Sequence, residues 1–201
     1  MITDSKKKLR RFLRKKRRSL TLAQQENLSA AIARTLLQLP EFQNSKKIAV
    51  YLAEENEVDL SSIIKQSLKM HKTIYLPVLD EIKKQTMKFC AYKLGDQLTL
   101  NQVGILEPPS SVDREIDPAM LDLVLMPLVG FDSFGHRLGR GGGYYDAAFD
   151  FCKEINFERY PFLVGVAYEF QKMEKIETDE TDVDLNKVVT EEKIYDFSKN
   201  E

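Results

Sequence analysis

Apolar residues recur at helical spacing near the N-terminus. Leu9, Phe12 and Leu13 fall on one face of a helix that we expect over residues 5–18. A free tail needs no apolar stripe, so this helix is predicted to pack against the rest of the protein.

A second helix is predicted to begin after Thr21. Thr21 and Gln24 have the spacing of a capping box, in which each side chain accepts a hydrogen bond from the other residue's backbone. Its inward stripe at helical spacing is Leu28, Ile32, Leu36 and Leu39, and Pro40 follows the end of the helix.

Farther along the chain, short apolar runs alternate with helical patterns. The predicted strands cover residues 47–53, 73–79, 87–92, 121–129, 162–167 and 187–190. One helix is expected to start at Asp59 and to carry Ile63, Ile64 and Leu68 on its inner face. Another is expected over residues 145–155, and residues 104–109 are expected to form an irregular loop.

This alternation defines the expected fold. Residues 121–129 are apolar almost throughout, which is typical of a strand with both faces covered. We therefore predict an α/β protein, a single-domain sandwich over residues 1–201 with a largely parallel central sheet flanked by helices. Ligands of such sheets bind beyond the carboxyl ends of the strands, where Glu57 and residues 135–146 fall.

Composition narrows the class of protein. With 201 residues, 43% apolar and 30% charged, the chain has the content of a soluble globular protein. No apolar run approaches the roughly 20 residues of a membrane helix, and no apolar signal core is present at the N-terminus. Cys90 and Cys152 form no Cys-x-x-Cys pair, so we expect two buried, reduced thiols and a cytoplasmic location.

The net charge of −1 conceals a basic arm. Residues 1–18 hold ten Lys and Arg against one acidic residue, Asp4, which leaves 20 basic and 30 acidic residues in the rest. Such an arm is compatible with binding to nucleic acid or a membrane surface. It is equally compatible with a solvated helix that has a few positions facing a polyanionic ligand.

The segment 135–146 carries the strongest chemical signal. It reads Gly-His-Arg-Leu-Gly-Arg-Gly-Gly-Gly-Tyr-Tyr-Asp between a predicted strand and a predicted helix. Glycine amides approach a ligand closely, arginine forks match phosphate oxygens, and a helix N-terminus favours anions. The common P-loop ending is absent, and Tyr144 stands where the dinucleotide fingerprint has its last glycine. A flexible turn remains an alternative, although a turn needs neither the arginines nor the Tyr-Tyr-Asp ending.

This segment, preceded by Pro127-x-x-x-Phe131-Asp132, resembles the signature of the 5-formyltetrahydrofolate cyclo-ligase family, also called methenyltetrahydrofolate synthetases. The resemblance extends over nearly the whole chain and includes Lys6 to Arg10, Tyr51-Leu52, Glu57 to Asp59, Leu76 to Val78 and Gly104 to Pro108. One stretch departs from the family pattern Pro-x-x-x-His-Asp. Residues 177–182 keep Asp182, but Glu177 and Thr181 replace the proline and the histidine.

The resemblance implies a set of site residues. For ATP these are Lys6, Arg10, Arg137, Leu138, Gly139, Arg140, Gly141, Gly142, Gly143, Tyr144 and Tyr145. For the folate they are Leu52, Glu57, Arg140, Gly141, Gly142, Gly143 and Tyr144, with Arg140 and Tyr144 as the catalytic pair. Asp146 and Asp182 are the implied Mg²⁺ ligands, and hard oxygen donors suit that ion.

The residues alone leave several of these roles open. A carboxylate suits the adjacent N–H donors of a pterin, but the choice of Glu57 among four neighbouring acids comes from the resemblance. Leu52 is also compatible with a plain core position, Asp146 with a helix start, and Lys6 and Arg10 with a solvated basic face. His136 is expected to be exposed and not catalytic.

The implied activity is the ATP- and Mg²⁺-dependent cyclisation of 5-formyltetrahydrofolate to 5,10-methenyltetrahydrofolate, with release of ADP and phosphate. The implied partners are small molecules, with no nucleic acid and no membrane, and the protein is expected to be a monomer. The formyl oxygen is itself the nucleophile on phosphorus, so no Ser, Cys or His nucleophile is needed. A nucleic-acid-binding module and a sugar-phosphate or coenzyme A enzyme remain the alternatives.

Overall fold

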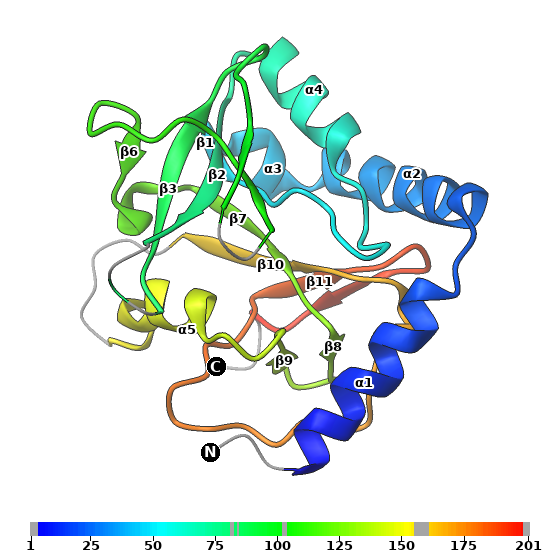
Figure 1. Cartoon of the computed structure of the whole chain (residues 1–201). Helices are drawn as coiled ribbons and strands as arrows, with labels where there is room; N and C mark the ends of the chain where they lie inside the picture. The colour runs from blue at the N-terminus through cyan, green and yellow to red at the C-terminus, as the bar shows by residue number, and fades with distance from the viewer. Residues whose placement is uncertain (1–3, 81–82, 84, 102–103, 155–160, 199–201) are drawn as a thin grey trace.

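The computed structural model describes residues 4–80, 83, 85–101, 104–154 and 161–198. Its centre is an eight-stranded sheet in the order β12-β11-β10-β7-β1-β2-β3-β6 (Figure 1). The five strands from β11 to β2 are parallel, and the strands added at each end are antiparallel. The strand bounds are β1 Lys47–Ala49, β2 Thr73–Leu79, β3 Met87–Tyr92, β6 Glu115–Ile116, β7 Leu123–Pro127, β10 Phe162–Val166, β11 Lys187–Val189 and β12 Ile194–Asp196.

Helices cover both faces of this sheet, as the sequence pattern predicts (Figure 1). Helices α2 (Leu22–Gln38), α3 (Pro40–Asn44) and α4 (Ser61–Lys69) lie on one face, and α5 (Tyr144–Ala148) lies on the other. Single turns of 3₁₀ helix occur at Pro118–Met120, Asp150–Lys153 and Glu169–Gln171. The predicted capping box of α2 between Thr21 and Gln24 is present.

Alternate strand residues feed two apolar cores. In β7, Leu123 and Leu125 join the core beneath α2 to α4, whereas Val124 and Met126 join the core that contains Phe149. Successive residues of a strand point to opposite faces, and all four side chains are fully buried because both faces are covered. The near-continuous apolar run of this strand therefore has the predicted cause.

The basic helix α1 (Asp4–Arg18) packs on the body through a third, smaller apolar cluster. Leu13 is 1% exposed and contacts a surface that includes Val129 and Leu138. That surface belongs to the hairpin of β8 (Gly130–Phe131) and β9 (Arg137–Leu138), which lies beside α1 in Figure 1. The expectation that Phe12 shares this inner face is wrong, since its side chain is 61% exposed.

Several predicted bounds differ from the structure. Strand β1 ends at Ala49 instead of continuing to residue 53. The helix expected over 145–155 leaves helical geometry at Phe149, which is fully buried against Phe89 with ring centroids 5.6 Å apart. Burial of this ring overrides the helical period there, and residue 155 lies outside the described residues.

A second kind of difference is a set of short strands that the sequence did not predict. The expected loop at 104–109 contains β5 (Leu106–Glu107), which pairs with β4 (Thr99–Leu100). Strands β6, β8, β9 and β12 were also not predicted, because two or three residues are too few to show a periodicity. Within the described ranges, no helix is long and apolar enough to cross a membrane.

Candidate active site

A cavity of about 860 Å³ opens where the parallel strands β1, β2 and β7 end. Every site residue implied by the resemblance lines it: Lys6, Arg10, Leu52, Glu57, Arg137, Leu138, Gly139, Arg140, Gly141, Gly142, Gly143, Tyr144, Tyr145, Asp146 and Asp182. They come from four separate stretches of sequence, so the fold collects them at the expected edge of the sheet.

One side of the cavity gathers cations. Arg10 Nε donates to the carbonyl oxygen of Gly139 at 2.7 Å, which places the α1 side chain against the glycine loop. Arg137, only 7% exposed on β9, donates to Asp146 Oδ1 at 2.6 Å. Lys6 Nζ lies 2.8 Å from Asp179 Oδ2 and 3.4 Å from Asp182 Oδ2. This side therefore suits a polyphosphate.

The glycine loop requires glycine at two of its positions. Gly141 and Gly143 have φ of +105° and +70°, which is left-handed backbone that residues with a Cβ rarely adopt. Gly143 is also the N-cap of α5, so the loop passes directly into the helix that carries Tyr144 and Asp146. The ring of Tyr145 faces the Arg137 guanidinium at 5.7 Å, and burial raises the pKa of its hydroxyl.

Asp146 and Asp182 both lie near Arg10 at the cationic side. Burial lowers the pKa of Arg10 and both carboxylates oppose that shift, so both act on the same guanidinium. The backbone N–H of Val183 also donates to Asp146 Oδ1 at 3.3 Å. Among the described residues, no group of three His, Cys, Asp or Glu side chains could hold a metal. Carboxylate oxygens are donors of the kind that Mg²⁺ prefers, and this ion usually keeps water and phosphate oxygens among its ligands.

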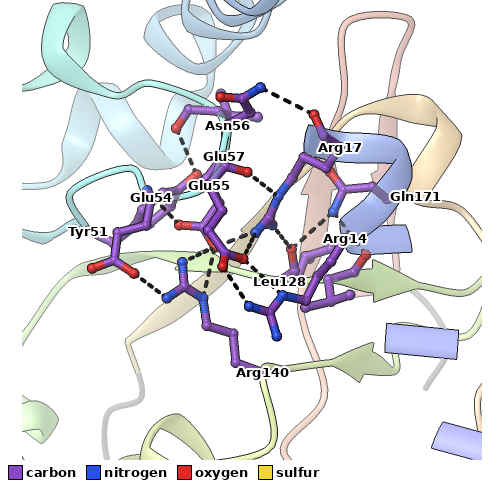
Figure 2. A network of polar contacts seen from close by, with 12 residues as sticks. Arg14, Arg17, Tyr51, Glu54, Glu55, Asn56, Glu57, Leu128, Arg140 and Gln171 are labelled. Carbon is purple, nitrogen blue, oxygen red and sulfur yellow. Dashed lines mark hydrogen bonds and ion pairs between the residues drawn. The ribbon is translucent and has the colours of Figure 1, made fainter. Parts of the chain in front are cut away.

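The opposite side of the cavity holds the buried carboxylate of Glu57, which is 4% exposed. Its Oε1 lies 2.9 Å from Arg140 Nη2 and 3.3 Å from Arg17 Nη1 (Figure 2). Its Oε2 accepts a hydrogen bond from the backbone of Glu54 at 3.1 Å. Leu52 lines the cavity and also packs against the core.

Arg140 bridges the two sides of the cavity. It belongs to the glycine loop that contacts Arg10, yet its guanidinium pairs with Glu54 and Glu57 (Figure 2). Burial acts to lower the pKa of Arg140, but these two carboxylates outweigh burial and raise it. The role implied by the resemblance is contact with both the triphosphate and the folate, and the position of this side chain is compatible with both.

Other lining residues carried no assigned role in the sequence: Tyr51, Glu54, Pro77, Leu79, Gln85, Met87, Ile105, Leu106, Glu107, Pro127, Ala147, Asp150, Asp179 and Thr181. Pro77 and Ile105 fall in stretches that resemble the family, and this resemblance is the signal by which the sequence could have marked them as cavity residues. Asp179 was not separable from Asp182 in an acidic run. Thr181 lines the cavity, so the departure from the family pattern affects the site itself.

The remaining candidate groups take no part in the cavity wall. His136 Nδ1 pairs with Asp132 Oδ2 at 2.9 Å, and its side chain is 23% exposed, so it is half-buried instead of exposed as expected. Both thiols are free. Cys90 is buried, but Cys152 is only partly buried, which corrects the expectation for that residue. Burial raises the pKa of the Cys152 thiol to about 12.

Fold and cavity together define an α/β protein with a cavity, lined in part by cations and a glycine loop, beyond the ends of parallel strands. A model of the 5-formyltetrahydrofolate cyclo-ligase family matches residues 2–191, and the chain belongs to this family. It is 33% identical over 187 residues to the 5-formyltetrahydrofolate cyclo-ligase of Escherichia coli K12, a match that covers 92% of this chain and 100% of the relative.

Two further comparisons agree. The 5-formyltetrahydrofolate cyclo-ligase of Haemophilus influenzae is 34% identical over 186 residues, which cover 92% of this chain and 97% of the relative. The solved structure of Aquifex aeolicus 5,10-methenyltetrahydrofolate synthetase superimposes with a TM-score of 0.81 at 31% identity, covering 100% of this chain and 95% of that one. The sequence resemblance and the α/β fold class are thereby confirmed.

Glu55, next to the cavity, generates a test of the electrostatics. It accepts hydrogen bonds from Arg14 at 2.6 and 2.9 Å and pairs with Arg18. These partners, Arg14 foremost, lower its pKa from 4.5 to about 2. A lowered folded-state pKa stabilises the protein above the unfolded value, and the contribution is lost as pH falls toward the folded value.

We therefore expect Glu55→Gln to lower the free energy of unfolding by about 1 kcal/mol at pH 7, after allowance for screening at this partly exposed site. The deficit relative to wild type should shrink as pH falls from 4.5 toward 2. Urea unfolding of both proteins at pH 7 and pH 3.5 measures this difference in unfolding free energy. The exposed Glu26→Gln is the control. A deficit that is constant with pH would contradict this assignment.

Proposed function

We propose that this protein closes the ring of 5-formyltetrahydrofolate to give 5,10-methenyltetrahydrofolate, with ATP converted to ADP and phosphate. One observation carries the proposal. In a chain of the cyclo-ligase family, a single cavity joins a cationic glycine loop to the buried carboxylate of Glu57. The first suits a triphosphate, and the second suits the adjacent N–H donors of a pterin.

In the first step the formyl oxygen of the folate attacks the γ-phosphorus of ATP. The bond between that phosphorus and the β,γ-bridging oxygen breaks, and ADP leaves with that oxygen. This step converts an amide oxygen, which is a poor leaving group, into a phosphate ester. The protein needs only to align the two substrates and neutralise charge on the phosphoryl oxygens.

In the second step N10 of the folate attacks the activated formyl carbon. The five-membered ring closes, N10 loses its proton to water, and phosphate departs with the former formyl oxygen. Both reactants belong to one molecule, so holding the folate in a bent conformation favours the step. The apolar walls supplied by Leu52 and Leu79 suit the fused ring system.

The residues of the cationic side have complementary roles in this proposal. Lys6, Arg10 and Arg137 bind the phosphates, and the backbone amides of Gly141 to Gly143 donate to the same phosphates. Arg140 stabilises the phosphoryl group in transfer, and Tyr144 faces the folate. Asp146 and Asp182 would hold Mg²⁺, which when bound neutralises charge on the phosphate oxygens.

We further propose that the chain acts as one domain, as a monomer, in the cytoplasm and without nucleic acid. The contacts of α1 favour this over a nucleic-acid-binding arm. Lys6, Arg10 and Arg17 are directed to carboxylates and carbonyl oxygens of the body, which leaves fewer cations for a separate polyanion.

The direct test is a spectroscopic assay. Mixing the protein with 5-formyltetrahydrofolate, ATP and Mg²⁺ should raise the near-ultraviolet absorbance of the methenyl product. Omitting any one of the three should abolish the rise. If folded protein binds ATP and yet produces no rise, the cavity remains an anion site but the folate reaction is rejected. In that case a sugar-phosphate or coenzyme A substrate would be the next candidate.

Arg140→Ala should lower kcat about a hundredfold to a thousandfold, the range found when one preorganised donor to a transition state is removed. The protein should remain folded, because the Arg140 side chain is 35% exposed and lies on a loop. Arg11→Ala, on the exposed face of α1, is the matched control and should keep wild-type kcat. A normal kcat for Arg140→Ala would remove this residue from the mechanism.

Asp146→Asn tests the metal site separately. The amide oxygen can still accept the hydrogen bond from Arg137, so the fold is retained, but the charge that binds Mg²⁺ is lost. We expect the Mg²⁺ concentration for half-maximal activity to rise about tenfold or more. Asp113→Asn, an exposed carboxylate, is the control. An unchanged Mg²⁺ titration would exclude Asp146 as a ligand.

A further inference from the structure

Arg17 differs from the other cations of α1. Its sequence position marks it as one of ten basic residues in an arm, yet it is 1% exposed and is the bulkiest fully buried side chain in the described part of the chain. Arg14 and Arg18, three residues before and one after, are 36% and 56% exposed. A buried guanidinium is costly unless it is paired, so its surroundings bear on its role.

The Arg17 side chain extends from α1 toward Glu55 and Glu57 (Figure 2). Nε donates to the carbonyl oxygen of Glu55 at 3.0 Å, and Nη1 donates to that of Leu128 at 3.3 Å. Nη1 also lies 3.3 Å from Glu57 Oε1. Nη2 is buried without a hydrogen bond and has only a 3.7 Å ion pair to Glu55 Oε2. Arg17 thus fixes both the turn before Glu57 and its carboxylate.

That turn is strained and externally held. Glu55 and Asn56 are consecutive non-glycine residues with positive φ, 49° and 57°. Asn56 Nδ2 donates to the carbonyl oxygen of Leu20 at 2.9 Å, just beyond α1, and Gln25 Nε2 donates to that of Glu57 at 2.8 Å. Tyr168 Oη donates to the carbonyl oxygen of Asn56 at 3.1 Å. These contacts from other elements hold the turn in the conformation that directs Glu57 toward the cavity.

Glu57 Oε1 has two guanidinium partners of different kinds. The Arg17 side chain is 2% exposed and lies behind the carboxylate, whereas that of Arg140 is 35% exposed and extends from the glycine loop. A ligand that approaches Oε1 from the cavity displaces Arg140, because Arg17 is enclosed by protein. Arg17 then remains as the cation that balances the buried Glu57 charge.

We propose that Arg17 is a positioning residue for folate binding, which holds the Glu57 carboxylate in place and directed at the pterin through the turn at residues 54–57. The inference rests on the proposed function. It gives α1 a second role, because the helix that carries Lys6 and Arg10 to the phosphates would also support recognition of the folate. Arg10 and Arg17 are seven residues apart, about 10 Å along a helix, so one rigid element would serve both substrates.

The test is a double-mutant cycle between Arg17 and Glu57, read separately for the two substrates. Arg17→Gln should raise KM for 5-formyltetrahydrofolate about tenfold or more, as for loss of a hydrogen bond to a charged group. Its KM for ATP should stay within about twofold. In an E57Q background, R17Q should have little further effect on the folate KM, because the two residues act as one unit. Arg11→Gln is the control for loss of one α1 cation.

Two results would overturn the proposal. One is a fall in kcat with both KM values unchanged. The other is an equal rise of the folate KM in the wild-type and E57Q backgrounds, which would indicate a general structural role. If R17Q fails to fold, the Arg17→Lys variant provides the test of the proposal instead. It keeps the charge but loses the fork, so the proposal requires a raised folate KM with a normal ATP KM, and a wild-type folate KM overturns it.

The outcomes separate this inference from the function on which it rests. Active wild-type protein with an unchanged folate KM in R17Q overturns the role of Arg17 alone. Folded wild-type protein with no turnover of 5-formyltetrahydrofolate rejects the proposed function and the role of Arg17 with it.

Discussion

The docking of α1 on the sheet edge is the contact on which the cavity depends. Leu13 enters an apolar cluster with Val129 and Leu138, and this packing fixes the helix against the β8–β9 hairpin. Burial of a leucine side chain contributes about 2 kcal/mol, which acts against the mutual repulsion of the many like charges on this helix. Without this contact, the cations that α1 brings to the cavity and the contact of Arg17 with Glu57 would both be lost.

The two sides of the cavity carry different charged groups. Cations from α1 and β9 converge on one side with the glycine loop, and a buried carboxylate stands on the other. Arg140 pairs across this division, so its guanidinium is the group whose position the two substrates would both affect. A site of this design needs no protein nucleophile, because alignment and charge neutralisation are the tasks that remain for the protein.

Long apolar runs were predictable and short elements were not. Strands β2 and β3 have the predicted bounds, since six or seven residues are enough to show a pattern. Strand β6 and the β8–β9 hairpin contain two residues per strand and carry no periodicity. The helix that starts at Tyr144 ends early, because Phe149 is drawn into the core beside Phe89. Local pattern fails where long-range packing decides the geometry.

By itself, the sequence determined the fold class, the family and part of the cavity lining, because a glycine–arginine loop and buried strands leave local signatures. Only the tertiary structure decided how the ten N-terminal cations divide their roles. Arg17 and Arg18 are neighbours in an unbroken basic run, yet one is buried against Glu57 and the other is exposed. Charge is a local property of the sequence, but burial and pairing depend on which surface the helix meets.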